Sequence, residues 1–201
     1  MAGTDAERRA SPGSGRERIL EAAYPLFSRS GIRAVGVDTI VEAAGVAKMT
    51  LYRNFPSKED LALAFLAVRE ERWTRAWLWS EVSQRADEPT ERLLAIFDVF
   101  GEWFARDDFE GCSFINVLLE QDTLDDPVRE ASVKHLANIR ELIQELAEQA
   151  RIDDPDGFSH QWHILMKGSI VAAGEGDRDA GRRARELGTL LLEQRGVLEP
   201  S

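Results

Sequence analysis

Residues 37–58 read VDTIVEAAGVAKMTLYRNFPSK, and this pattern predicts two short helices joined by a tight turn. The apolar face of the first helix ends at Ala44. Gly45 supplies the turn, because a residue without a Cβ atom adopts a positive φ at no steric cost. Leu51 and Phe55 lie four residues apart and mark the inner face of the second helix. The stretch is therefore a candidate helix-turn-helix.

The outer face of the second helix carries charge, hydrogen-bond donors and one aromatic ring, the groups that a helix in the DNA major groove needs. These positions are Lys48, Met49, Thr50, Tyr52, Arg53 and Asn54. Pro56 ends the helix, because proline restricts the residue before it and donates no backbone N–H. Ser57 is expected to cap the next helix, which starts at Lys58, and Asp38 is expected to cap the first one.

The segment AAGVAKMTLYRNFPSKEDL, residues 43–61, resembles the helix-turn-helix of TetR/AcrR-type transcriptional regulators. The matching pieces are Ala44-Gly45-Val46, Thr50-Leu51-Tyr52, Phe55 and Ser57-Lys58-Glu59. The resemblance covers roughly residues 16–66. It implies an all-α fold of about nine helices, with an N-terminal three-helix DNA-binding domain and a C-terminal helical domain for ligand binding and dimerisation.

The polar, Gly-, Ser- and Pro-containing residues 1–15 predict a disordered arm. The resemblance implies a DNA-binding domain at 16–60 and a ligand-binding and dimerisation domain at 61–201. The helix around residues 48–54 is expected to lie in the major groove of a double-stranded DNA operator. The predicted DNA-binding residues are Thr39, Lys48, Met49, Thr50, Tyr52, Arg53, Asn54 and Lys58.

The net charge of −11 over 201 residues is unusual for a DNA-binding protein, but it is unevenly distributed. Residues 1–57 carry 8 Lys and Arg against 6 Asp and Glu, whereas residues 58–201 carry 17 against 30. A locally basic face is what phosphate contact requires, and an acidic body discourages non-specific binding. The charge therefore favours a sequence-specific DNA-binding protein over one that coats DNA.

Amphipathic patterns predict helices along the remaining chain and no convincing strand. The expected helical segments are 16–30, with Pro25 inside it, then 58–87, 90–106, 112–120, 127–151, 155–174 and 177–195. The long segment from Lys58 is expected to connect the DNA-binding head to the body.

Large apolar side chains and a few polar groups in the body predict a pocket for a small-molecule effector. The candidate ligand-binding residues are Phe100, Trp103, Phe104, Phe114, Asn116, His135, Trp162, His163 and Met166. Plain core packing is the competing interpretation. The last two helices form the candidate homodimer interface, through Leu165, Gly168, Ala172, Leu187, Leu190 and Leu191, or else they close the core of the monomer.

Together with these patterns, the resemblance implies a cytoplasmic transcriptional regulator, most simply a repressor released from a palindromic operator by a small hydrophobic ligand. No apolar run suits a membrane span, and no secretion signal, metal site, cofactor or catalytic residue is expected. Two alternatives stay open. Cys112, the single cysteine, could be a redox sensor, or it could act with His135 or His163 in an enzyme.

Overall fold

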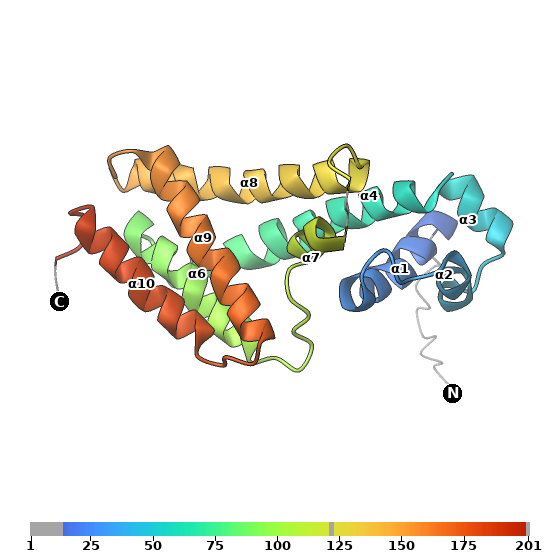
Figure 1. Ribbon diagram of the computed structural model, residues 1–201, viewed down its shortest axis with the longest axis horizontal. Helices are drawn as coiled ribbons and strands as arrows, with labels where there is room; N and C mark the ends of the chain where they lie inside the picture. Colours follow the sequence, from blue (N-terminus) through green and yellow to red (C-terminus); the bar gives the residue numbers. More distant parts are fainter. Residues whose placement is uncertain (1–13, 121–122, 200–201) are drawn as a thin grey trace, which may run out of the picture.

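The computed structural model describes residues 14–120 and 123–199, and Figure 1 shows these as an elongated all-helical molecule. Within these residues the secondary structure forms nine continuous helical runs and no strand. The predicted all-α class is therefore confirmed. Most of the predicted arm, residues 1–13, lies outside the described residues.

The head consists of α1 (Gly15–Ser30), α2 (Val37–Ala44) and α3 (Lys48–Asn54). Ser14 and Glu17 form a capping box that starts α1, and each satisfies a backbone N–H of the other. Ile19 and Leu51 are both fully buried in the core of the head. The predicted helix at 48–54 is confirmed with the same bounds as α3.

The expected role of Asp38 as a helix cap is wrong. Helix α2 already begins at Val37, its N-cap residue is Gly36, and this cap has no side-chain hydrogen bond. Asp38 lies in the first turn instead, and its Oδ1 accepts a hydrogen bond from Nζ of Lys48 at 2.7 Å. The carboxylate therefore serves a neighbouring helix rather than its own.

The long connecting helix contains a feature that its sequence pattern did not indicate. The run comprises α4 (Lys58–Arg69), the π-helical stretch η1 (Glu70–Trp79) and α5 (Ser80–Arg85). Ser57 and Asp60 form the capping box at its start, which confirms the predicted cap. Apolar spacings of three and four fit both kinds of helix, so the pattern could not reveal the π-helical turns.

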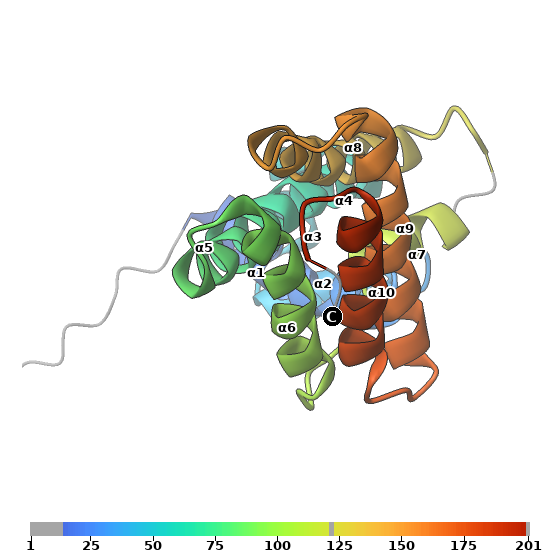
Figure 2. The ribbon, with the colours of Figure 1, turned by 90° about the vertical axis from the view of Figure 1, so that its left-hand side faces the viewer.

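The body is built from α6 (Pro89–Phe104), α7 (Ser113–Glu120), α8 (Pro127–Gln149), α9 (Pro155–Gly174) and α10 (Ala180–Gln194). Each begins within three residues of its predicted start. Figure 2 shows α6, α9 and α10 side by side, with α8 across their ends and beside α4. None of the helices in the described part of the chain is long and apolar enough to cross a membrane.

Close packing between α6 and α10 depends on Gly181. A Cβ atom there would lie 2.7 Å from Cα and 2.8 Å from N of Gly101, which are backbone atoms of α6. The absence of a side chain therefore sets how closely the two helices approach. This contact anchors the outermost helix of the body.

Candidate nucleic-acid interface and small-molecule sites

Helix α3 separates its apolar and polar residues between two opposite faces. Leu51 is fully buried against the head, while Met49 is 72% exposed and Tyr52 is 41% exposed. Lys48 and Arg53 are exposed as well. An exposed helix face with two cations and one phenol can enter a groove lined by phosphates and base edges.

Thr50 and Asn54, two other predicted contacts, lie half-buried at the edge of this face. Nδ2 of Asn54 donates to the carbonyl oxygen of Thr50 at 2.8 Å. Both side chains lie near Gly15, where an added Cβ would be 3.2 Å from Cγ2 of Thr50. They are therefore placed beside the start of α1 rather than at the most exposed part of α3.

The remaining predicted DNA contacts lie outside α3. Thr39 is exposed on α2, and Lys58 is half-buried at the start of α4. Nζ of Lys58 donates to the carbonyl oxygen of Arg33 at 3.2 Å, and burial lowers its pKa. Lys58 thus already has a partner within the chain.

Two contacts that the sequence pattern missed hold the recognition face. The hydrogen bond that Lys48 donates to Asp38 raises the pKa of Lys48 and keeps that side chain beside α2. A guanidinium nitrogen of Arg18 donates to the carbonyl oxygens of Ala44, at 2.9 Å, and Gly45, at 2.7 Å. Gly45 has the predicted left-handed conformation, with φ of 59°, so Arg18 clamps the turn between α2 and α3.

Comparison with known proteins agrees with this geometry. The profile described as "Bacterial regulatory proteins, tetR family" matches residues 19–65, and that described as "Tetracyclin repressor-like, C-terminal domain" matches residues 89–187. A crystal structure of a TetR transcriptional regulator from Streptomyces avermitilis is 30% identical, with a TM-score of 0.82. That alignment covers 92% of this chain and 99% of the other. The chain belongs to the TetR family.

Two curated TetR-type relatives align with only part of this chain. A helix-turn-helix transcriptional regulator of Mycobacterium tuberculosis is 37% identical over 94 residues, which are 47% of this chain and 46% of that protein. The transcriptional repressor KstR of Rhodococcus jostii is 47% identical over 57 residues, 28% of this chain and 27% of the repressor. This chain thus spans less than half the length of these two relatives. Membership of a family of DNA-binding transcriptional regulators leaves the enzyme alternative without support.

Most of the predicted ligand-binding residues are packed in the body of this TetR-family chain. Phe100, Trp162 and Met166 are buried, and Trp162 packs against Phe97 with ring centroids 5.1 Å apart. His135 packs on Phe114, with ring centroids 5.1 Å apart, and also contacts Glu70. Of the nine candidates, Trp103 lines a cavity of about 150 Å³ between head and body, and the other eight do not line it.

The redox alternative is not supported by the position of Cys112. Its side chain is buried, and burial raises the pKa of the thiol. A sensor cysteine requires an accessible thiol with a lowered pKa. Cys112 therefore has the environment of an inert core residue.

The predicted dimer residues form an apolar surface on α9 and α10. Leu187 is 52% exposed and Leu190 is 60% exposed, and Ile164 is exposed on the adjacent helix. Leu165 and Leu191 are partly buried beside them, and Gly168 and Ala172 border a neighbouring hollow of about 280 Å³. The predicted residues thus lie together on one surface rather than closing the core.

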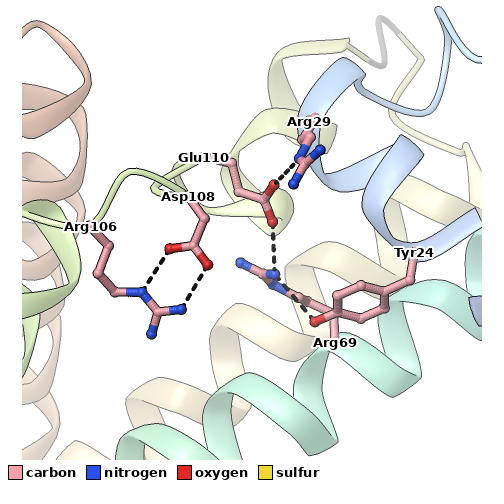
Figure 3. A network of polar contacts seen from close by, with 6 residues as sticks. All are labelled: Tyr24, Arg29, Arg69, Arg106, Asp108 and Glu110. Atoms are coloured by element: carbon pink, nitrogen blue, oxygen red, sulfur yellow. Dashed lines mark hydrogen bonds and ion pairs between the residues drawn. The ribbon is translucent and has the colours of Figure 1, made fainter.

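A polar network joins the head to the body (Figure 3). A guanidinium nitrogen of Arg69, on α4, donates to the hydroxyl of Tyr24 and to Oε1 of Glu110, each at 3.3 Å. Arg29, on α1, approaches the other carboxylate oxygen of Glu110 at 3.9 Å. Arg72 pairs with Glu21 of α1 a turn further along. These contacts attach α1 of the head to the long helix and to Glu110.

Proposed function

We propose that this TetR-family regulator is a homodimeric repressor that binds a near-palindromic operator and is released by a small hydrophobic molecule. The observation that carries the proposal is the division of α3, in which Leu51 is buried and Lys48, Tyr52 and Arg53 are exposed. A helix anchored in this way presents its donors as a rigid surface to the major groove.

Individual contacts follow from the chemistry of each side chain. Arg53 can donate a planar fork to guanine or to phosphate, and Lys48 can approach the same groups as a point charge. Tyr52 suits a phosphate oxygen, which fixes register without reading sequence. Met49 offers only apolar contact, and the half-buried Thr50 and Asn54 would contact the edge of the groove. Thr39 and Lys58 would contact phosphates beside α3.

The apolar surface of α9 and α10 supports the homodimer. Two copies that cover Leu187 and Leu190 against each other would remove these side chains from water in a four-helix packing. Dimerisation would also place two heads about one helical turn apart, roughly 34–36 Å, which matches inverted half-sites. A single α3 reads only a few base pairs, so specificity requires both copies.

The effector part of the proposal rests on unsatisfied polar atoms in the core of the body. Within the described residues, Nε1 of Trp162 and Nδ1 of His163 are buried without a hydrogen-bond partner. Buried polar atoms are rarely left without a partner, so a ligand that parts these helices would supply the missing contacts. Binding to a conformer with misplaced heads would then release the operator.

Selection of DNA from a random pool by the full chain tests the proposal. We expect recovery of two inverted half-sites, and Arg53→Ala should weaken operator binding about tenfold or more. The matched control is Arg75→Ala, an exposed arginine in η1. Enrichment of no sequence, or equal losses in both variants, would refute sequence-specific recognition by α3.

Sedimentation tests the dimer separately. Leu187→Glu with Leu190→Glu should yield monomers, because each would bury a carboxylate in an apolar interface. Leu119→Glu, at a leucine that is 78% exposed on α7, should leave the mass unchanged. A concentration-independent monomer mass for the unaltered chain would contradict the dimer. Constant operator affinity across a broad panel of hydrophobic compounds would contradict the effector.

A further inference from the structure

A cavity of about 150 Å³ opens at the junction of head and body, outside the apolar core. Three tryptophans, Trp73, Trp77 and Trp103, form one part of its wall, and Arg69, Arg72 and Arg106 form another. We call this space the junction cavity. A space of this size accommodates roughly one benzene-sized ring with a small substituent.

The π-helical stretch builds much of this wall. Arg72, Trp73 and Trp77 all lie in η1, and Arg69 lies directly before it. Arg69, Trp73 and Trp77, at intervals of four along this run, line the same cavity. π-Helical turns are rare in proteins and occur frequently at functional sites. Their position here, at a cavity that adjoins the head, is independent support for a binding role.

The tryptophans suit a flat aromatic guest. The ring centroids of Trp73 and Trp103 are 5.0 Å apart with an interplanar angle of 60°, and those of Trp73 and Trp77 are 5.5 Å apart. Indole faces and edges presented at such angles can contact a guest ring by stacking and edge-to-face packing together. An aliphatic chain would gain less from these flat surfaces.

The charged groups of the junction cavity suit an anion. Three guanidinium groups line it against two carboxylates, those of Asp108 and Glu110, and Arg72 also pairs with Glu21 of α1. The side chain of Arg69 is deeply buried and Arg106 holds Asp108 through two hydrogen bonds of 2.7 Å (Figure 3). Each guanidinium has five N–H donors, so these pairs do not exhaust the donors present.

One further donor belongs to the tryptophan wall. Nε1 of Trp73 is buried and has no hydrogen-bond partner within the part of the chain that the structure describes. An acceptor on a guest would satisfy this donor once the indole turns toward the cavity, whereas an ammonium group would face three guanidinium groups against two carboxylates. A carboxylate is also planar and matches the guanidinium fork.

We propose that the junction cavity binds a small aromatic carboxylate, with its ring against Trp73, Trp77 and Trp103 and its carboxylate toward the arginines. This site is distinct from the body core of the proposed effector site, with which it shares only Trp103. Tyr24 of α1 also lines it, so an occupant contacts the head directly. A carboxylate that engages Arg69 competes with Glu110 and Tyr24 for that guanidinium, which changes the linkage of α1 to α4.

Titration of the full chain, without DNA, tests the proposal. Benzoate and 2-furoate are compared with benzamide, 2-furamide and benzylamine, by calorimetry for stoichiometry and by tryptophan fluorescence for proximity. We expect one site per chain and at least tenfold tighter binding of each acid than of its amide. Absence of saturable binding by both acids, or equal binding of acids and amides, would overturn the proposal.

Two variants locate the site. Arg72→Gln should weaken binding of benzoate about tenfold, while Arg75→Gln, three residues further along the same stretch, should leave it unchanged. Arg106→Gln, at an exposed residue after α6, provides a second variant should Arg72→Gln fold poorly. Equal affinities in the cavity variants and in Arg75→Gln would place any binding elsewhere and sink the proposal.

Only the regulatory consequence rests on the proposed function. Benzoate should change operator affinity in the unaltered chain but not in Arg72→Gln. The titrations contain no DNA. Failure to select an operator would therefore refute the proposed repressor function and leave the proposal about the junction cavity standing. Conversely, if the chain binds an operator but neither acid binds to the chain, only the cavity proposal is refuted.

Discussion

The carboxylate of Glu120, at the end of α7, accepts a hydrogen bond from the backbone N–H of Ile32, just beyond α1, at 3.0 Å. The same oxygen accepts from the backbone N–H of Arg33 at 3.1 Å, and the Arg33 guanidinium returns a bond to the carbonyl oxygen of Glu120. One side chain of the body therefore holds the backbone of the head where α1 ends. Gly31 has a φ of 78°, and an added Cβ would overlap this carboxylate.

Replacement of Glu120 by alanine should loosen this attachment. Two backbone donors lose a charged acceptor, so the free energy of unfolding should fall by about 1–2 kcal/mol. Hydrogen exchange at the amides of Ile32 and Arg33 should accelerate about tenfold. Glu120→Gln keeps one acceptor oxygen. Its free energy of unfolding and its exchange rates should lie between those of the unaltered chain and those of Glu120→Ala. Unchanged protection of both amides in Glu120→Ala would show that the carboxylate does not hold the head.

The pair of Asp38 with Lys48 should limit the affinity of the recognition face for DNA. Asp38→Asn removes the negative charge that raises the pKa of Lys48 and frees its ammonium for phosphate. We expect tighter DNA binding at low salt and a salt dependence that is steeper by about one counterion.

The control for that measurement is Glu42→Gln on the same helix, which removes one exposed negative charge and leaves the Lys48 pair intact. It should change affinity less and leave the salt slope nearly as it was. Identical slopes for Asp38→Asn and the unaltered chain would mean that Lys48 does not reach phosphate.

Gly181→Ala should destabilise the body. The new methyl group would press on the backbone of Gly101, which cannot rotate away, so α6 and α10 must separate. Overpacking of this kind costs about 1–3 kcal/mol, more than the gain of about 1 kcal/mol from helix propensity. Gly174→Ala on α9, where nothing lies within 4 Å of the added atom, should be neutral or stabilising. Urea unfolding curves of the two variants decide the point.

His163 should make the free energy of unfolding fall in acid. Burial lowers its pKa from an ordinary value of 6.5 to about 3. Between these values the unfolded chain binds a proton that the folded chain excludes, so this contribution is full above pH 6.5 and is lost toward pH 3. Titration of this one group cannot change the free energy of unfolding by more than about 1.4 kcal/mol per pH unit.

Urea unfolding at several pH values, compared with His163→Gln, isolates this contribution. The free energy of unfolding of the unaltered chain, minus that of His163→Gln, should fall steadily as the pH falls from 6.5 to 4. A difference that stays constant across this range would show that His163 is protonated in the folded chain.

Local chemistry explains why the head was predictable. Gly45 and its left-handed turn, the four-residue spacing of Leu51 and Phe55, and the Ser57–Asp60 box each involve residues that are close in the chain. Such interactions form in any context that buries the apolar side. The bounds of α3 could therefore be derived before its surroundings were known.

Contacts between distant residues required the tertiary structure. The clamp of Arg18 on Gly45 joins residues 27 apart, and that of Glu120 on Ile32 joins residues 88 apart. An arginine or a glutamate in an amphipathic pattern is equally consistent with a solvated face, so neither partner could be assigned. The candidate effector residues were likewise chosen by type, and packing decided that most of them fill the core.

The chain by itself determined a DNA-reading head, because its turns, caps and apolar spacings act over a few residues. Only the packed molecule decided where that head is tied to the body and where space remains between them. The junction cavity exists because Tyr24, Trp73 and Trp103 converge from three helices around a π-helical stretch, and neither periodicity nor composition encodes such a meeting.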